Sequence, residues 1–293
     1  MKTRESLSSR IFDSFNIIIL ILFALTVVIP FIHVIAISLS SPKAIVNAQV
    51  TLWPVGFSLK NYMYVMKNSI FFNSFKITLI IVILGTAISM LMTLLTAYPL
   101  SRVYLPGRKV FILILVITLI FQSPMVPLYL VVKMYGLLNT IWALILPFAL
   151  SVFNTFICIT FFKQLPNELF EAARIDGMTE YGILFKIVVP LSKPVIVTLL
   201  LFFSVSYWNS YQSALYYITN PNLRPLQLYL WSLVAQSNVS ELGAMAAAET
   251  AVSYSPEGLM MATVITATIP IIIVYPFLQK HFMKGLLTGS LKG

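Results

Sequence analysis

Charge is scarce in this chain, and its scarcity limits the class of protein. Asp, Glu, Lys and Arg together make up 10% of the 293 residues, whereas hydrophobic residues make up 59%. Soluble domains contain about 25% charged residues. The sequence also contains long stretches without any charge, and a transmembrane helix needs about 20 predominantly apolar residues. The composition therefore indicates a membrane protein.

The charge-free stretches predict an all-α polytopic membrane protein with six transmembrane helices. A porin-type barrel does not fit, because its strands alternate over about 10 residues and lack apolar runs of this length. We expect a single transmembrane domain over residues 1–293. The predicted spans lie near residues 15–38, 76–98, 110–131, 139–161, 188–209 and 259–279.

Ionisable and reactive side chains are almost absent from these spans. Cysteine occurs once, as Cys158, so an internal disulfide is impossible. His33 is the one clear ionisable residue within a span, and buried charges usually mark proton relays or ion paths. The sequence therefore argues against a proton-coupled pump.

Motifs for catalysis and for nucleotide or metal binding are also missing. The sequence has no G-x-x-x-x-G-K-[ST] phosphate loop, no H-E-x-x-H motif and no Cys/His cluster. The spans lack the nucleophile with its base, or the paired Asp residues, that an intramembrane protease needs. We expect no catalytic residue, no metal site and no cofactor bound by this chain. If the chain drives transport uphill, a partner supplies the energy.

The basic residues are distributed unevenly along the chain. With the N-terminus in the cytoplasm, most Lys and Arg residues lie on the inner side, as the positive-inside rule requires. This orientation places both termini and the loop of residues 163–187 in the cytoplasm. The longest polar connections, 40–74 and 210–257, then lie outside, and the second is expected to contain a short helix with Ser240 as its N-cap. Bases beside spans explain the net charge of +10 without a nucleic-acid partner.

The inner loop contains the stretch NELFEAARIDGMTEYGILFKIVVPLSKP, residues 167–194, which holds four of the nine acidic residues. Asn167 is expected to be the N-cap of a helix of two turns. Gly177 suits the left-handed position that follows a helix. Thr179 is expected to cap a second segment, which Pro190 interrupts.

A helix of two turns is marginal by itself, because nucleation costs more than so few hydrogen bonds return. Leu169, Ala172 and Ala173 place small and apolar groups near one another, since residues three and four apart are neighbours. Such groups suit a knob that enters a socket on another protein. A solvated cytoplasmic loop is the alternative. The residues expected at the rim of the knob are Glu171, Arg174 and Asp176.

The same loop resembles the EAA motif of binding-protein-dependent ABC importer permeases. That motif reads E-A-A, three residues, G, nine residues, I, two residues and P, and it is carried here by Glu171, Ala172, Ala173, Gly177, Ile187 and Pro190. Residues 73–102, 126–147 and 275–293 look like further signatures of sugar importer permeases. The resemblance covers nearly the whole chain. It is closest to maltose-type permeases with six spans, in the Gram-positive branch that handles complex or acidic oligosaccharides.

The resemblance implies a transport mechanism and a set of partners. Two homologous permease chains form the pore, two ATP-binding subunits carry ATP and Mg, and an extracytoplasmic binding protein delivers the sugar. The loop helix docks on an ATP-binding subunit, whose closure moves the spans. The chain is then not an enzyme, and it lies among lipids in the bacterial cytoplasmic membrane. The residues implied in coupling are Glu171, Ala172, Ala173, Asp176, Gly177, Ile187 and Pro190.

Sugar sites combine polar side chains with aromatic platforms, and the sequence contains candidates for both. An aromatic belt at the membrane interface, with hydrogen bonds between helices, is the alternative explanation. In maltose-type importers the partner permease can carry most of the sugar contacts. The candidates for the substrate path lie at the outer end of the fifth span and in the third span, and they are Tyr207, Trp208, Asn209, Gln212 and Gln122.

Two other functions stay open at this point. One is an ABC permease for a non-sugar solute, such as an amino acid or phosphate, although the aromatic residues and the sugar-type stretches speak against it. The other, from a different class, is a stand-alone secondary transporter or channel, which the charge-poor spans disfavour. The sequence identifies neither the sugar nor the partner chains.

Overall fold

A computed structural model of the chain describes residues 7–121, 123–244 and 255–290. These residues form helices and turns with no strand among them, which confirms the predicted all-α class. The chain divides into two compact units. Unit 1 comprises residues 1–69 and 232–269, and unit 2 comprises residues 70–231 and 270–293.

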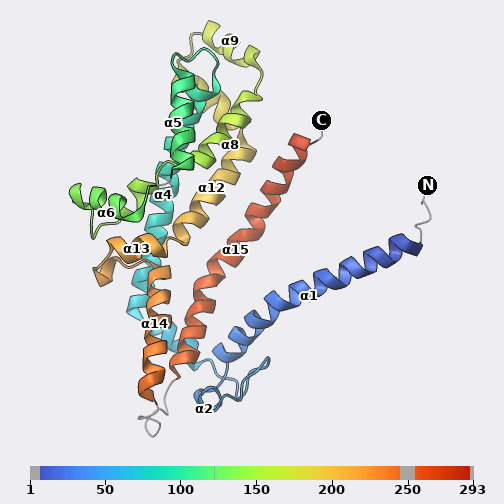
Figure 1. The fold of residues 1–293 in the computed structure, drawn as a ribbon, viewed down its shortest axis with the longest axis vertical. Coiled ribbons are helices and arrows are strands. Elements are labelled where there is room, and N and C mark those ends of the chain that lie inside the picture. The colour runs from blue at the N-terminus through green and yellow to red at the C-terminus, as the bar shows by residue number, and fades with distance from the viewer. Residues whose placement is uncertain (1–6, 122, 245–254, 291–293) are drawn as a thin grey trace. The chain divides into compact units, whose positions relative to one another are not determined.

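Three of the predicted spans are continuous helices (Figure 1): α1 (Leu7–Ser38), α4 (Ser69–Ser101) and α15 (Pro256–Ser290). Within the described part of the chain, these three helices are long and apolar enough to cross a membrane. At 1.5 Å per residue, α4 is about 50 Å long, whereas the hydrocarbon core of a bilayer is about 30 Å thick. An end of α4 therefore extends out of the hydrocarbon core.

The predicted span near 110–131 consists of two helices, because α5 (Arg108–Ile120) ends before α6 (Met125–Met134) begins. Pro124 precedes α6 and disfavours a helical conformation of the residue before it. The predicted single span is therefore two separate helices.

The predicted span near 139–161 is also broken. The segment formed by α7 (Trp142–Ile145) and η1 (Leu146–Phe148) is inclined by 48° to α8 (Val152–Lys163). Ser151 supplies the N-cap of α8, and its hydroxyl accepts a hydrogen bond from the amide of Asn154 at 3.3 Å. A side-chain cap of this kind satisfies one of the free amides of a new helix.

The predicted span near 188–209 begins later than expected. The helical turns α10 (Glu180–Ile183), η2 (Leu184–Val188) and α11 (Val189–Leu191) lead to α12 (Lys193–Trp208) across a bend of 89°. The expectation that Pro190 interrupts the helix was wrong, since Pro190 lies inside α11. The break lies at Ser192, and Pro194 occupies the first turn of α12, where its missing amide has no partner to lose.

The connection 210–257 contains more helix than expected. After α13 (Tyr211–Tyr217) and η3 (Pro221–Leu223), α14 runs over Leu226–Ala244. Ser240 therefore lies inside α14 and is not the N-cap of a separate helix.

Unit 1 is held by short polar contacts beside a small apolar core. Two short helices, α2 (Pro42–Val46) and α3 (Lys60–Lys67), follow α1. The side-chain amide of Asn61, which is buried, donates to the carbonyl of Ser38 at 3.2 Å. The imidazole of His33 lies 2.5 Å from the carbonyl oxygen of Thr51. His33 is therefore satisfied by the backbone of its own unit.

In unit 2, α4 packs closely against α12 because it presents small side chains to it. A Cβ atom at Gly85 would lie 2.7 Å from the ring of Tyr207, so a side chain does not fit there. The Tyr207 hydroxyl forms a hydrogen bond with the Ser89 hydroxyl at 2.8 Å. Small residues and hydroxyls are the usual means of close helix packing in membranes. The buried small and hydroxyl residues of α4 are Ser74, Thr78, Gly85, Thr86, Ser89, Thr93, Ala97 and Ser101.

Candidate functional site

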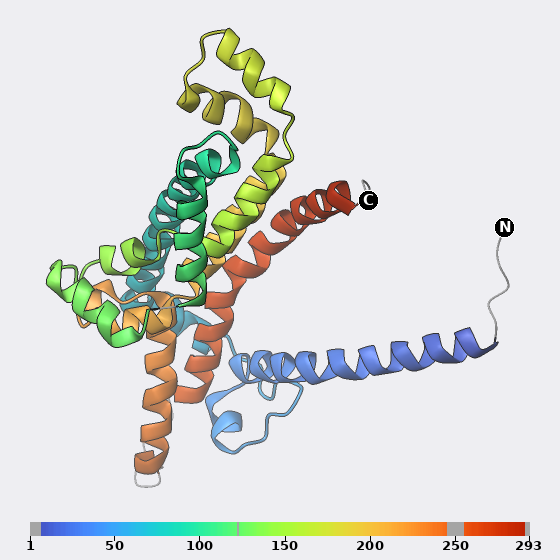
Figure 2. The same cartoon turned by 45° about the horizontal axis from the view of Figure 1, so that its top comes forward.

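The helix predicted in the EAA-like loop is present as α9 (Asn167–Ile175), at one end of the unit 2 helices in both views (Figures 1 and 2). Asn167 is the first residue of the helix, and Pro166 takes the cap position without a side-chain hydrogen bond, so the cap predicted at Asn167 was wrong. Gly177 has φ +75°, as predicted. The Thr179 hydroxyl accepts from the amide of Gly182 at 3.2 Å, so the second predicted cap is confirmed.

The two faces of α9 differ from the prediction. Phe170 and Ala173 are buried, and Phe170 is only 2% exposed. Ala172 is exposed, and Ile175 is 85% exposed. Ala172 and Ala173 were expected on one face, but Ala173 faces the chain itself because it lies three residues after Phe170, on the same side of the helix.

The other residues of the motif lie in α9, at its C-terminal end and on the turns that follow it. Glu171 and Asp176 are exposed. Ile187 is half-buried in η2, and Pro190 is exposed in α11. The motif therefore combines an exposed helix face with a segment that leads into α12.

Sequence reasoning missed the residue that holds α9 in place, Arg102, which follows α4 and is only 5% exposed. Its Nη2 donates to the carbonyl of Phe162 in the last turn of α8 at 2.6 Å, and its Nε donates to the Ser101 hydroxyl at 2.9 Å. Its guanidinium carbon lies 3.8 Å from the ring centre of Phe170 on α9. Burial lowers the pKa of Arg102, but the ordinary pKa of arginine lies so far above neutral that the side chain stays charged.

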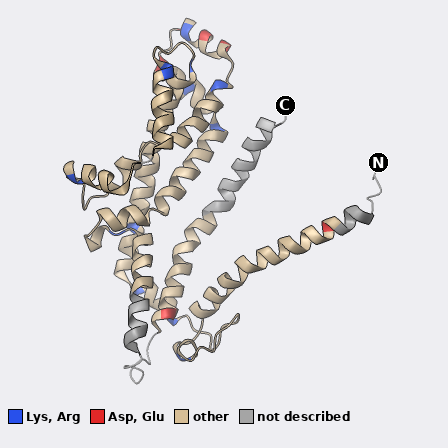
Figure 3. Cartoon of the chain, in the orientation of Figure 1, with Lys and Arg blue, Asp and Glu red and all other residues tan. Residues whose placement is uncertain are grey.

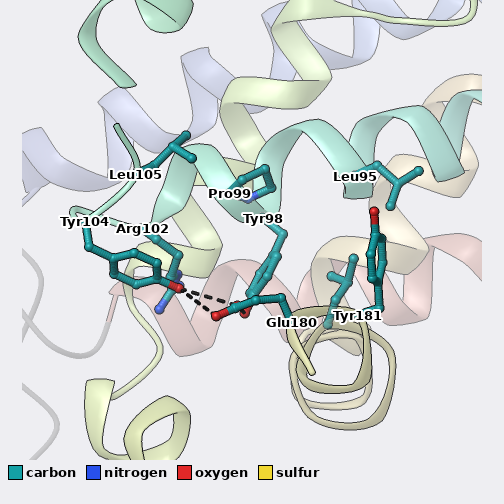
Figure 4. Close-up of a pocket in the computed structure, with 9 residues that line it drawn as sticks. Leu95, Tyr98, Pro99, Arg102, Tyr104, Leu105, Glu180 and Tyr181 are labelled. Carbon is teal, nitrogen blue, oxygen red and sulfur yellow. Dashed lines mark hydrogen bonds between the residues drawn. The ribbon is translucent and has the colours of Figure 1, made fainter. Parts of the chain in front are cut away.

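Glu180, in the first turn of α10, is the second connection (Figure 4). Its Oε2 accepts from the hydroxyl of Tyr98 on α4 at 2.5 Å, and its Oε1 accepts from Nε of Arg174 on α9 at 3.0 Å. Tyr104, between α4 and α5, donates to both carboxylate oxygens at 3.4 Å and accepts from Nη2 of Arg174. Burial alone raises the pKa of Glu180, but the hydrogen bonds from Tyr98 and Arg174 outweigh it and lower the pKa.

We call these five residues, Tyr98, Arg102, Tyr104, Arg174 and Glu180, the α9 cluster. Two pockets of about 350 and 580 Å³ adjoin it, and both are lined by Arg102 and Tyr104. Charged side chains gather at this end of unit 2 and are sparse along its long helices (Figure 3). The end that carries α9 is therefore the polar end of an apolar bundle.

The predicted substrate-path residues separate into buried and exposed ones. Tyr207 and Trp208 are buried at the end of α12, and the ring of Trp208 meets Phe75 edge-on at 6.1 Å. Asn209 and Gln212 are exposed. Gln122 lies outside the described residues. Tyr207 and Trp208 thus pack between helices in this conformation, whereas Asn209 and Gln212 face outwards.

A second set of polar contacts, away from α9, joins the connection between α6 and α7 to the connection after α13. The Oδ1 atom of Asn139 accepts from the amide and the hydroxyl of Thr219, at 2.7 and 2.8 Å, and from the amide of Asn220 at 2.9 Å. The amide of Asn139 donates to the carbonyl of Tyr217 at 2.9 Å. Asn139 has φ +58°, a left-handed value that Asn tolerates. We call Asn139 and its three partners the Asn139 latch.

Comparison with known proteins identifies the family. Residues 99–287 match the family described as the binding-protein-dependent transport system inner membrane component. The chain belongs to this family. The permease is 42% identical to the polygalacturonan/rhamnogalacturonan transport system permease protein YtcP of Bacillus subtilis (strain 168), over 98% of this chain and 100% of the relative.

A second relative and a solved structure agree with this family. Protein LplC of the same strain is 40% identical to the permease over 98% of this chain and 96% of the relative. The crystal structure of a bacterial ABC transporter involved in the import of the acidic polysaccharide alginate contains a chain with a TM-score of 0.89 and 33% identity. That match covers 96% of this chain and 100% of the other. The permease is therefore a membrane-embedded transport subunit of an ABC importer, and it is not an enzyme.

Proposed function

We propose that this permease forms half of the pore of an oligosaccharide importer and that α9 couples it to an ATP-binding subunit. The observation that carries the proposal is the division of α9 into two faces. Phe170 and Ala173 anchor the helix to its own chain, while Ala172 and Ile175 remain exposed. Leu169, Ala172 and Ile175 follow one another at intervals of three residues and are all exposed, so they form a row on one side of the helix. Adjoining exposed apolar side chains mark a surface for protein contact.

The proposed assembly has two permease chains, two ATP-binding subunits and an extracytoplasmic solute-binding protein. ATP and Mg belong to the ATP-binding subunits. The family supports partnership with a binding protein. The distribution of Lys and Arg supports a cytoplasmic location for both termini and for α9 in the plasma membrane.

The substrate class follows from the relatives. One relative is named for polygalacturonan and rhamnogalacturonan, and the solved structure for alginate, which its title calls an acidic polysaccharide. We therefore propose oligosaccharides that contain uronate units as the cargo. Among the candidate path residues that the structure describes, Asn209 and Gln212 are the exposed ones and are proposed to meet the sugar.

The coupling role of α9 is tested with Ala172→Asp in the complete importer. The residue is exposed, so the substitution leaves the fold of the permease intact but places a charge on the docking face. We expect the ATP-binding subunits to be lost on purification and sugar uptake to be abolished. Ala172→Ser, of similar size and uncharged, is the matched control. Normal co-purification and uptake in Ala172→Asp would refute the coupling role.

Gly177 offers an independent test of the same role. No atom lies within 4 Å of a Cβ at this position, but its φ of +75° strains an ordinary L residue. Asn adopts left-handed values more readily than a β-branched residue does. We expect Gly177→Asn to retain uptake and Gly177→Val to lose it. Equal uptake in both variants would show that the left-handed turn after α9 has no part in coupling.

The substrate class is tested by transport. Cells that carry the importer are given labelled oligogalacturonides or neutral oligosaccharides of the same length, and a strain that lacks this permease is the control. We expect uptake of the uronate sugars that depends on the permease. Uptake of the neutral sugars alone would contradict the proposed cargo but would leave the permease role in place.

A further inference from the structure

The α9 helix is attached to a part of the chain far from it in sequence. Its neighbours α8 and α10 are joined to it by short connections, and the one that follows α9 contains Gly177 in a left-handed conformation. The contacts that cross to α4 come instead from the α9 cluster (Figure 4). These contacts decide whether α9 can pivot on its two connections or moves together with α4.

We propose that Arg102 and Glu180 are positioning residues that clamp α9 and α10 to the end of α4, so that these elements move as one body. Displacement of α9 by its partner is then transmitted directly to α4. This inference rests on the proposed docking of α9 on an ATP-binding subunit.

Arg102 joins three helices through one guanidinium group. It continues from the last residue of α4, hydrogen-bonds the carbonyl of Phe162 at the end of α8 and stacks on the ring of Phe170 in α9. The C-terminal end of a helix has free carbonyls and a partial negative charge, so a cation there is stabilised. A buried charge without such partners is costly, which fixes the side chain in this one arrangement.

Glu180 joins the same helix to the next segment. Its carboxylate holds the Tyr98 hydroxyl of α4 and the Arg174 guanidinium of α9 at the same time. The Thr179 cap fixes the start of α10, so the position of Glu180 is set by the backbone. The two residues therefore restrain α9 along two directions, through the Phe170 ring and through Arg174.

Motion that reaches α4 at this end can reach the transport helices. Along α4 the hydroxyl of Ser89 contacts that of Tyr207 in α12, and Gly85 allows the Tyr207 ring to approach. Tightly packed helices transmit displacement because a packed interior deforms little. The clamp thus connects the proposed docking face to the packed pair of α4 and α12.

The experiment measures a distance between two spin labels in the complete importer. Val103→Cys lies beside Arg102 and Asn167→Cys lies at the start of α9, outside the apolar docking residues, and both positions are exposed. The native Cys158 is buried and is not expected to react. We expect the distance to be the same without nucleotide and in the ATP–vanadate state. In Arg102→Leu and in Glu180→Gln, we expect the distribution of label distances to broaden and its mean to differ between the two states.

Transport by the unlabelled variants completes the test. We expect uptake to fall about tenfold in Arg102→Leu, a typical size for coupling between sites, while the ATP-binding subunits still co-purify. Arg108→Leu is the matched control, because Arg108 also donates to a backbone carbonyl, that of Leu100 at 2.8 Å, but makes no hydrogen bond to α9 among the described residues. We expect it to keep both the distance and the uptake.

The possible outcomes separate the clamp from the docking role. A distance that changes with nucleotide in the wild-type background, or normal uptake with an unchanged distance in Arg102→Leu, would overturn the clamp. Retention of the ATP-binding subunits by Ala172→Asp would instead overturn the docking role. The label distance reports on the clamp in either case.

Discussion

The α9 cluster and the Asn139 latch both join segments that are distant in sequence, but they do so with different chemistry. The α9 cluster uses side chains with full charges, aromatic rings and hydroxyls that come from α4, the connection that follows α4, α9 and α10. The latch uses one neutral amide oxygen, which accepts from two backbone amides and a hydroxyl, and one backbone hydrogen bond to Tyr217. The first connects three helices, whereas the second connects two loops.

The difference shows what each connection is suited to do. A single acceptor with three donors fixes one backbone geometry, since displacement of either loop breaks several hydrogen bonds together. The α9 cluster spreads its contacts over long side chains, so its two anchors can hold helices through a small rigid-body movement. We infer that the latch maintains the fold and that the α9 cluster serves coupling.

The largest effect on stability is expected at the latch. Asn139→Leu removes the acceptor and places an unfavourable side chain at φ +58°, and we expect a loss of about 2–3 kcal/mol. The midpoint of thermal inactivation of the purified importer measures it. Asn139→Asp keeps an acceptor and tolerates the same backbone, so it should stay near the wild type. Asn139→Gly should lie between them, and any other order would contradict this account of the latch.

Tyr98→Phe tests the other of the two regions, the α9 cluster. The change removes the hydrogen bond to Glu180 but keeps the ring, which lies beside Phe170 at 6.5 Å. We expect a loss of about 1 kcal/mol and a larger relative loss of uptake than of thermal stability. A larger relative loss of thermal stability than of uptake is the pattern expected for Asn139→Gly. If Tyr98→Phe gave that pattern too, the α9 cluster and the Asn139 latch would not differ in role.

The ion pair between Arg174 and Glu180 should contribute less. The two side chains are 37% and 50% exposed, so water screens their attraction. A double-mutant cycle with Arg174→Ala and Glu180→Ala should give a coupling energy of about 0.2–1 kcal/mol. High salt should reduce it. A coupling energy well above this range would mean that the ion pair, and not the contacts of Arg102 and Tyr98, contributes most to holding α9.

The smallest effect is a dependence on pH. The folded protein lowers the pKa of Glu180, so its contribution is fully present above the ordinary carboxyl pKa of about 4.3 and is lost as the pH falls through the lower, folded value. Arg102 and Arg174 remain charged throughout this range. The difference in thermal midpoint between wild type and Glu180→Gln should therefore be constant near neutral pH and shrink in acid. The difference in thermal midpoint between wild type and Asn139→Gly should not change with pH.

Local sequence signals predicted part of the site and missed its anchor. Gly177 and the Thr179 cap were predicted because turns and caps depend on a few adjacent residues. The burial of Phe170 and Ala173 has a signal in their spacing of three residues, but the partner that covers them is far away. Arg102 was counted only as a basic residue flanking a span, and no local pattern relates it to Phe162 or Phe170.

The sequence by itself determined the class of this protein: scarce charge and long apolar stretches require helices in a membrane, because the backbone must satisfy its hydrogen bonds internally there. It also located the end of α9, through Gly177, and the start of α10, through the Thr179 cap. Only the tertiary structure decided which face of α9 is free, where the spans break, and that Arg102 and Glu180 join α9 to α4. Those features depend on contacts between residues far apart in the chain, which hydropathy and local spacing do not encode.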